Sequence, residues 1–431
     1  MNLLYDKFLT CNQNITTDTR KITKGCIYFA LKGDKFDGNI FAEEALEQGA
    51  TYVVVDNPSV VKNDKYILVD DVLSTLQQLA NHHRKQLKIP VIGITGSNGK
   101  TTTKELIHAV LSKKYNTQYT QGNLNNHIGV PLTLLTITPK HEIAVVEMGA
   151  NHQLEIDMLC RIAEPNFGII TNIGKAHLEG FGGIEGVKKG KSELYKYLKE
   201  VNGTVFLHGD DNVLADLSKE NNKVTYGTNK LYDIVGKCNK TSLFVELAWR
   251  TRYKATEVKG ADFIKTNLVG IYNYNNALCA ACVGNYFKVE EALINDALQN
   301  YAPTNNRSQL QKTENNSLIL DYYNANPTSM QAAIENFYNM AADAKMLVLG
   351  DMLELGEESI TEHQAIINLL HEKKFDNYLL VGPIFSSLQK EKSFINSKQA
   401  QEFLQVNPAK NKTILIKGSR GIALEEVVKA L

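Results

Sequence analysis

The chain of 431 residues lacks long apolar runs, and no stretch reaches the roughly 18 consecutive apolar residues that a membrane-spanning helix requires. It also lacks a net charge, because 47 lysine and arginine residues balance 47 aspartate and glutamate residues. This balance leaves no global field that would attract nucleic acid or an anionic membrane. We therefore expect a small soluble substrate, with no membrane insertion and no nucleic-acid partner.

Cysteine is sparse, and the first residues contain no apolar segment of the length that a secretory signal needs. Six scattered cysteines in a chain of this length argue against a disulfide framework and for a reducing compartment, so we expect a cytoplasmic protein. Cys279 and Cys282 form the one close pair, inside a run of small residues that predicts a buried helix. A zinc site is the weaker alternative, since no second thiol pair or nearby histidine completes it.

The length allows roughly three domains, and the order of strand-like and helix-like segments divides the chain accordingly. Residues 1–88 contain short strand-like runs around a helix-like stretch, which predicts a small N-terminal α/β domain. In residues 89–302 apolar strands alternate with helices, which predicts a central P-loop ATPase-like domain with a mostly parallel sheet. Residues 303–431 repeat that alternation and predict a C-terminal, Rossmann-like, doubly wound domain. The polar stretch 219–240 predicts hairpins or loops.

Residues 95–106 read TGSNGKTTTKEL and follow the apolar run VIGIT, which predicts a glycine-rich turn between a strand and a helix. Such a turn suits a nucleotide, because backbone amides approach the phosphates, Lys100 neutralises charge and the Thr101 hydroxyl ligates Mg²⁺. Ile94 stands where the strict P-loop pattern has glycine, so an ordinary tight turn before a helix is the alternative. The expected phosphate-binding residues are Gly96, Ser97, Asn98, Gly99, Lys100, Thr101 and Thr102.

Two polar residues follow apolar strands and should lie at the edge where an open α/β sheet collects ligands. Glu147 follows IAVV and is a natural Mg²⁺ ligand beside Thr101. His177 follows GIITNI; histidine is a softer ligand, so a hydrogen-bonding role is equally open. Lys191 lies in VKKGKSELYKYL near the expected start of a helix, where a solvated basic face is the ordinary interpretation.

Asparagines and one arginine supply further candidate nucleotide contacts. Asn273 and Asn276, in GIYNYNNA, carry paired donor and acceptor amides that suit an adenine edge, with helix capping as the alternative. Arg307 is a candidate phosphate clamp. The segment DYYNANPTSM at 321–330 follows a predicted strand, and its composition is equally typical of a loop with a helix cap.

Taken together, TGSNGKTT, VVEMGAN, TNIGKAHLEGFG, GKSEL and the asparagine motif resemble, in order, the Mur ligase family of ATP-dependent amide-forming enzymes of bacterial cell-wall synthesis. The resemblance covers nearly the whole chain. DTR at 18–20, GNLNNHIGVPLTLL at 122–135, YNANP at 323–327, LGDMLELG at 349–356 and KGSR at 417–420 resemble one branch of the family. For that branch, the resemblance implies UDP-N-acetylmuramoyl-tripeptide and D-alanyl-D-alanine as substrates. We expect a monomer.

The resemblance also implies roles for individual residues. Lys100 and Thr101 would handle the ATP phosphates and a first Mg²⁺, Glu147 and His177 would complete metal coordination, and a carbamoylated Lys191 would bind a second Mg²⁺. Lys100, Lys191 and His177 are thus the implied catalytic residues.

Contacts to the nucleotide and the substrates are implied in the same way. The implied nucleotide contacts are Asn273 and Asn276 at adenine, Arg307 at a phosphate and Asp321 at the ribose. The implied substrate contacts are Asp18, Thr19 and Arg20 at uridine, Asn125 and Asn126 at the sugar peptide, and Tyr323, Asn324 and Asn326 at the dipeptide.

The implied reaction activates the tripeptide carboxylate as an acyl phosphate, without a covalent enzyme nucleophile. Three positions depart from the family pattern: Tyr272 replaces a usual histidine, Tyr322 a usual serine, and Gly174–Lys175 is an unusual lead into His177. Other ligases of the superfamily remain alternatives, either one that adds a single amino acid or a folylpolyglutamate synthetase. The first usually carries DNPR, which is absent here. A nucleotide-gated binding protein without ligase activity is the alternative from a different class.

Overall fold

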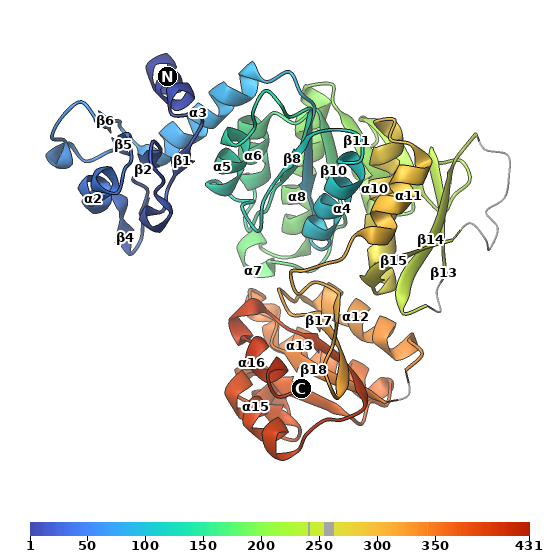
Figure 1. Ribbon diagram of the computed structural model, residues 1–431. Helices are drawn as coiled ribbons and strands as arrows, with labels where there is room; N and C mark the ends of the chain where they lie inside the picture. Colours follow the sequence, from blue (N-terminus) through green and yellow to red (C-terminus); the bar gives the residue numbers. More distant parts are fainter. Residues whose placement is uncertain (240–241, 254–262, 343) are drawn as a thin grey trace.

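The computed structural model describes residues 1–239, 242–253, 263–342 and 344–431, which form three α/β domains in chain order (Figure 1). The N-terminal sheet has the order β1-β2-β5-β6, with every pair parallel. Its strands are β1 (Ile15–Thr16), β2 (Ile27–Phe29), β5 (Tyr52–Val55) and β6 (Tyr66–Leu68). The long helix α3 (Val72–Gln86) then leads to the central domain and packs against its helices α5 (Gly129–Leu135) and α6 (Glu155–Ala163).

The central sheet has the order β15-β14-β13-β12-β11-β10-β7-β9-β8, parallel from β8 to β13 and antiparallel at the two pairs beyond. Strands β7 (Val91–Thr95) and β9 (Ile143–Glu147) are buried at every position, as expected for parallel strands with helices on both faces. The remaining strands are β8 (Thr117–Tyr119), β10 (Phe167–Ile170), β11 (Thr204–His208), β12 (Asn222–Gly227), β13 (Ile234–Asn239), β14 (Phe244–Thr251) and β15 (Ile264–Val269). The expected mostly parallel sheet is confirmed.

The polar stretch 219–240 is the main error of the sequence interpretation. It holds strands β12 and β13, and these pair in parallel, so they do not form a hairpin; residue 240 lies outside the described residues. Only one end of each strand is buried, which leaves too few apolar positions to show a strand period. The placement of Lys191 is also corrected, because it lies in the middle of α8 (Ile184–Glu200) and not at its start.

The C-terminal sheet has the order β16-β17-β21-β18-β19-β20, and β16 alone among these described strands runs antiparallel to its neighbour. Its strands are β16 (Gln309–Lys312), β17 (Asn316–Asp321), β18 (Lys345–Gly350), β19 (Tyr378–Val381), β20 (Ser393–Phe394) and β21 (Lys412–Lys417). Helices α12 (Pro327–Asn339) and α13 (Ser359–Glu372) pack against each other. The three-domain α/β fold is confirmed, while the boundaries at 88 and 302 stay predictions.

The P-loop helix α4 (Lys100–Leu111) is held by close packing against α10 (Tyr274–Tyr286). Leu106, Ile107 and Val110 share one buried core with Cys279 and Cys282 of α10. Small residues allow this approach: a Cβ on Gly284 would lie 2.4 Å from Val110 Cγ1. Within the described part of the chain, no helix combines the length and apolar character needed to cross a membrane.

Candidate functional site

The turn between β7 and α4 is built around two glycines with positive φ. Gly96 has φ +137°, and a Cβ there would lie 2.0 Å from Thr171 Oγ1. Gly99 has φ +80°, and a Cβ there would lie 2.7 Å from Asn276 Oδ1. The backbone can therefore turn tightly only with glycine at both positions, and it opens directly into the positive N-terminus of α4.

Lys100 begins α4 and folds back over the turn. Its Nζ donates to the carbonyls of Gly96 at 2.6 Å and Ser97 at 3.3 Å. Burial lowers the pKa of Lys100 to about 8; nearby Glu147 opposes this shift and Arg307 adds to it. A phosphate group at this turn would bring negative charge next to the ammonium and favour its charged form.

Glu147 ends β9 beside α4, as its sequence position predicts. Its Oε1 accepts from Thr101 Oγ1 at 3.1 Å and from Asn125 Nδ2 at 2.8 Å. Its Oε2 is buried without a hydrogen-bond partner among the described residues, 3.5 Å from Lys104 Nζ. An unsatisfied carboxylate oxygen next to a threonine hydroxyl is a donor set that fits Mg²⁺.

His177 lies at the start of α7 (Leu178–Phe181) with a left-handed φ of 52°. Its Nδ1 contacts Glu354 Oε2, and Glu354 comes from the loop after β18 in the C-terminal domain. The hydrogen bond from His177 is the main cause that lowers the pKa of Glu354. The imidazole is therefore oriented by a carboxylate from another domain, which leaves Nε2 as the ring nitrogen for a ligand.

Lys191 is buried on α8, one layer behind the residues that face the cavity. Its Nζ donates to the Ala150 carbonyl at 3.0 Å and lies 4.9 Å from the centroid of the Phe181 ring. Burial lowers the pKa of Lys191 well below its usual value, and the charge of Lys100 adds to this effect. Such surroundings favour the neutral amine, which is the form that reacts with CO₂.

Two asparagines at the start of α10 join three parts of the chain. Asn273 Nδ2 donates to the Val269 carbonyl at 2.9 Å and to Ser308 Oγ at 3.0 Å. Asn276 Nδ2 donates to Asn273 Oδ1 at 2.9 Å, and Asn276 Oδ1 accepts from Thr103 Oγ1 at 3.1 Å. Neither amide caps α10 with its side chain, so helix capping does not explain the pair.

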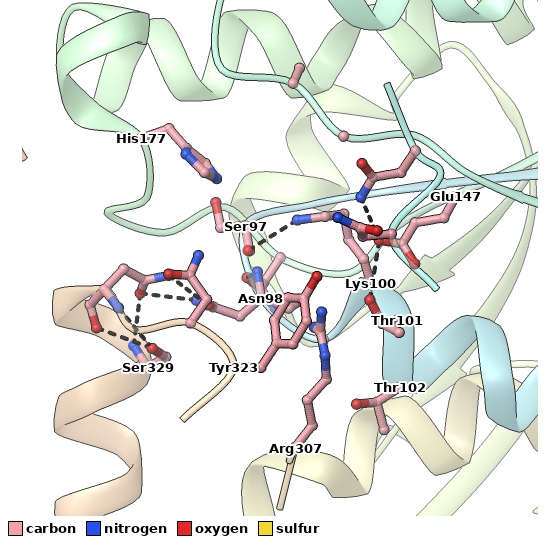
Figure 2. Close-up of a pocket in the computed structure, with 18 of the residues that line it drawn as sticks. Ser97, Asn98, Lys100, Thr101, Thr102, Glu147, His177, Arg307, Tyr323 and Ser329 are labelled. Atoms are coloured by element: carbon pink, nitrogen blue, oxygen red, sulfur yellow. Dashed lines mark hydrogen bonds between the residues drawn. The ribbon is translucent and has the colours of Figure 1, made fainter. Parts of the chain in front are cut away.

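An aromatic ring and two arginines mark the C-terminal side of the site. The Arg307 guanidinium lies 3.8 Å and that of Arg420 5.6 Å from the centroid of the Tyr323 ring. Asp321, at the end of β17, accepts from Lys417 Nζ at 2.6 Å. This face therefore presents positive charge beside an aromatic surface, toward the P-loop (Figure 2).

The loop before α12 reaches the P-loop itself. Asn326 caps α12 through a capping box with Ser329, and its Nδ2 donates to Asn98 Oδ1 at 2.7 Å. Asn324 Oδ1 accepts from the Ala325 amide at 2.9 Å. The segment is thus a loop with a helix cap, as the alternative interpretation of its sequence predicted. The same loop also contacts the P-loop turn.

These elements line one cavity of about 690 Å³ between the central and C-terminal domains. The predicted residues on its wall are Ser97, Asn98, Gly99, Lys100, Thr101, Thr102, Asn125, Asn126, Glu147, His177, Asn273, Asn276, Arg307, Asp321, Tyr323, Asn324 and Asn326. Asn126 also fixes the start of α5, because its Oδ1 accepts from the amides of Ile128 and Gly129.

Five predicted site residues lie off this wall. Gly96 and Lys191 do not line it, and neither do Asp18, Thr19 and Arg20. In the N-terminal domain, Asp18 caps the short helix Thr19–Lys21 and pairs with Arg20.

Glu354, Lys417 and Arg420 were missed as individual site residues. Their motifs, LGDMLELG and KGSR, were visible in the sequence, but nothing local showed which side chains face the cavity. Ser308, which links Asn273 to the C-terminal domain, carried no sequence signal.

Family models match three consecutive parts of the chain. Residues 13–95 match the model described as Mur ligase family, catalytic domain. Residues 94–284 match the Mur ligase middle domain, and residues 306–420 match the model described as Mur ligase, glutamate ligase domain.

Relatives and solved structures match nearly the full length. UDP-N-acetylmuramoyl-tripeptide–D-alanyl-D-alanine ligase of Bacillus subtilis (strain 168) is 38% identical over 98% of this chain and 93% of that protein. The protein of that name from Escherichia coli (strain K12) is 36% identical over 97% and 93%. MurF from Acinetobacter baumannii has a TM-score of 0.86 at 31% identity, covering 96% of this chain and 92% of that one. MurF ligase from Thermotoga maritima in complex with ADP has a TM-score of 0.84 at 27% identity, covering 98% and 97%.

Proposed function

The chain belongs to the Mur ligase family, and we propose that it joins D-alanyl-D-alanine to UDP-N-acetylmuramoyl-tripeptide with cleavage of ATP. The product is the pentapeptide precursor of peptidoglycan. The chain is an ATP-dependent ligase, and relatives that carry the name of this activity match it over nearly their full length.

One observation supports the assignment most strongly: a single cavity is lined by the P-loop of one domain and by the Tyr323–Asn326 loop of another. The first is suited to a nucleotide and the second to a small amide-bearing partner. A hydrogen bond from Asn326 to Asn98 joins the two. Such an arrangement suits a reaction in which an acyl group is activated and then handed to an amine.

Divalent metal has a suitable donor set in this cavity. Thr101 and Glu147 would hold one Mg²⁺, and the unsatisfied Glu147 Oε2 supports this assignment. His177 lines the same cavity and would complete the coordination. A carbamate on Lys191 would add the carboxylate for a second Mg²⁺. When bound, the metal neutralises negative charge on the phosphates.

In the proposed reaction, a terminal carboxylate oxygen of the tripeptide attacks the γ-phosphorus of ATP. The bond from this phosphorus to the bridging oxygen breaks, which gives an acyl phosphate and ADP. Lys100 and the N-terminus of α4 stabilise the charge of the transferring group. Arg307 faces the same phosphates and adds a planar fork of donors.

The second half-reaction forms the amide bond. The neutral amine of D-alanyl-D-alanine attacks the acyl carbon, loses a proton, and the carbon–oxygen bond to phosphate breaks. Tyr323, Asn324 and Asn326 position the dipeptide, and Asn125 and Asn126 contact the peptide of the UDP sugar.

The remaining proposed contacts hold the two nucleotides. Asn273 and Asn276 face adenine and Asp321 the ribose, while Asp18, Thr19 and Arg20 in the N-terminal domain line the uridine end. We further propose that the enzyme is a cytoplasmic monomer.

The proposal is tested by offering several acceptors to the purified protein with ATP, Mg²⁺ and UDP-N-acetylmuramoyl-tripeptide. D-alanyl-D-alanine should be ligated to the tripeptide. Two control reactions should give no product: a single amino acid offered with the UDP-sugar precursor that is one residue shorter, and glutamate offered with a folate. Tripeptide labelled with ¹⁸O in its terminal carboxylate should pass one label to the released phosphate. Turnover with a single amino acid or a folate would support ligase activity but contradict the proposed substrates. Phosphate released without the ¹⁸O label would contradict the acyl-phosphate intermediate.

A further inference from the structure

The chain passes from the central to the C-terminal domain through residues 301–308, here called the crossover segment, which follows α11 (Glu291–Asn300). Two of its residues, Asn306 and Ser308, have left-handed φ values of 56° and 52°. Residues with side chains adopt this conformation at a cost, so it persists only where the surroundings fix it. The crossover segment is therefore held in place by contacts from outside itself.

Glu105, in the second turn of the P-loop helix, supplies contacts to the first part of this segment. Tyr301 Oη donates to Glu105 Oε2 at 2.5 Å. Asn305 Nδ2 donates to Glu105 Oε1 at 3.0 Å and to Oε2 at 3.2 Å. One carboxylate thus ties both ends of the stretch 301–305 to the helix that begins with Lys100.

The last residue of the crossover segment is fixed independently. The Ser308 amide donates to Asp321 Oδ1 at 3.2 Å, and Ser308 Oγ accepts from Asn273 Nδ2 at 3.0 Å. Ser308 Oγ also lies 2.9 Å from Tyr272 Oη. The segment is therefore anchored on both sides of Arg307.

Between these anchors, Arg307 extends into the cavity. Figure 2 shows its side chain beside Tyr323, directed toward the P-loop residues. Its Nε is buried and has no hydrogen-bond partner within the described ranges. A buried donor without a partner is costly, and an acceptor on a ligand that contacts the guanidinium would offset this cost.

We propose that Glu105 is a positioning residue, which holds the crossover segment against the P-loop helix so that the Arg307 guanidinium faces the nucleotide. Glu105 itself does not line the cavity, so it acts through Arg307 and not by touching ATP. The proposal rests on the function proposed above for Arg307.

The test is a double-mutant cycle of Glu105 and Arg307. ATP affinity is measured by equilibrium binding, and kcat and KM are measured by phosphate release. Glu105→Ala and Arg307→Ala should each weaken ATP binding by about tenfold, the effect of losing roughly one charged hydrogen bond. The double variant should be no weaker than Arg307→Ala, because Glu105 acts through that residue. Glu105→Gln should recover much of the affinity, since Oε2 alone accepts from both Tyr301 and Asn305.

Asp296→Ala is the matched control. It removes an acceptor for Lys113, just beyond α4, and for Asn300 at the end of α11, but no side-chain contact of residues 301–308. It should leave ATP affinity unchanged. If thermal unfolding shows that Glu105→Ala is misfolded, Asn305→Ala takes its place in the cycle.

Wild-type affinity in Glu105→Ala, or a double variant whose loss is the product of the two single losses, would overturn the proposal. The binding measurement separates this outcome from failure of the proposed function, because it needs ATP alone. A wild-type protein without ligase turnover would reject the function, while the cycle of ATP affinities would still decide the role of Glu105.

Discussion

Buried charge at single residues distinguishes this site from an ordinary glycine turn. Lys191 is the clearest case, because burial lowers its pKa well below the usual value while its Nζ meets a backbone carbonyl and an aromatic ring. A buried ammonium with no carboxylate in hydrogen-bond contact among the described residues is costly. Conversion to a carbamate would remove the positive charge and create a metal ligand.

For Lys191→Ala we predict a loss of ligase activity of at least about 100-fold, because a charge-stabilising group is removed. Small organic acids such as acetate should partly restore the rate by entering the space that the side chain leaves. The measurement is phosphate release with and without the acid. Lys189→Ala, on the exposed face of the same helix, is the control. It should keep the wild-type rate, and added acid should not change that rate. Full activity in Lys191→Ala would remove this residue from the site.

His108 on the P-loop helix leads to a prediction about acid stability. Burial, with a smaller effect from Lys104, lowers its pKa to about 4, and its ring stacks on Tyr119 at 3.7 Å between centroids. Between about pH 6.5 and 4 the unfolded chain binds a proton here that the folded protein does not. The contribution of His108 to the free energy of unfolding is therefore complete above the pKa that this histidine has in the unfolded chain. It is lost as the pH falls below that value, by at most about 1.4 kcal/mol per pH unit.

His108→Gln should make the free energy of unfolding less dependent on pH across this window, as measured by urea unfolding at several pH values. His371→Gln, at an exposed position, should keep the wild-type slope. An unchanged slope in His108→Gln would show that its imidazole titrates normally in the folded protein.

Among the secondary-structure elements, the strand–turn–helix of the P-loop could be predicted because all its signals are local: an apolar strand, two glycines and an amphipathic helix. Strands β12 and β13 could not, since each is buried at only one end and shows too few apolar positions for a strand period. The contact between Asn273 and Ser308 could not be predicted, because Ser308 lies at the boundary with another domain.

Gly99 tests the backbone requirement of the P-loop turn. Gly99→Ala should destabilise the protein by more than about 2 kcal/mol, since it combines left-handed strain with a clash against Asn276, and should weaken ATP binding. Urea unfolding and equilibrium ATP binding measure the two effects. Gly25→Ala is the matched control, because Gly25 has φ +90° but nothing lies within 4 Å of the place its Cβ would take. Equal losses of stability in the two variants would show that the close approach to Asn276 is unimportant.

At the scale of the whole molecule, the cavity lies where the central and C-terminal domains meet. His177 pairs with Glu354 and Lys175 with Glu362 across this boundary, and the Lys175 amide donates to Thr328 Oγ1 at 3.0 Å. The departure from the family pattern at Lys175 thus has a structural partner. The sequence showed the motifs on both sides but not which residues meet, because that depends on how the domains dock.

Lys175→Met should weaken the interaction between the two domains by up to about 1 kcal/mol, the free energy of a partly exposed ion pair. KM for D-alanyl-D-alanine should then rise by up to about fivefold. KM for ATP should rise less than KM for the dipeptide, because most of the proposed phosphate contacts come from the P-loop of the central domain, whereas Tyr323, Asn324 and Asn326 all belong to the C-terminal domain. Steady-state kinetics at low and high salt measure both values, with Lys62→Met, which breaks an exposed pair in the N-terminal domain, as the control. A larger effect on ATP than on the dipeptide would contradict this role of the Lys175 ion pair.

The ligase assignment itself is decided by phosphate release from ATP, Mg²⁺ and UDP-N-acetylmuramoyl-tripeptide, with and without D-alanyl-D-alanine, together with the mass of the product. We predict release that depends on the dipeptide, with one UDP-N-acetylmuramoyl-pentapeptide formed for each phosphate. ATP binding without dipeptide-dependent release, using tripeptides that end in either diaminopimelate or lysine, would contradict the assignment.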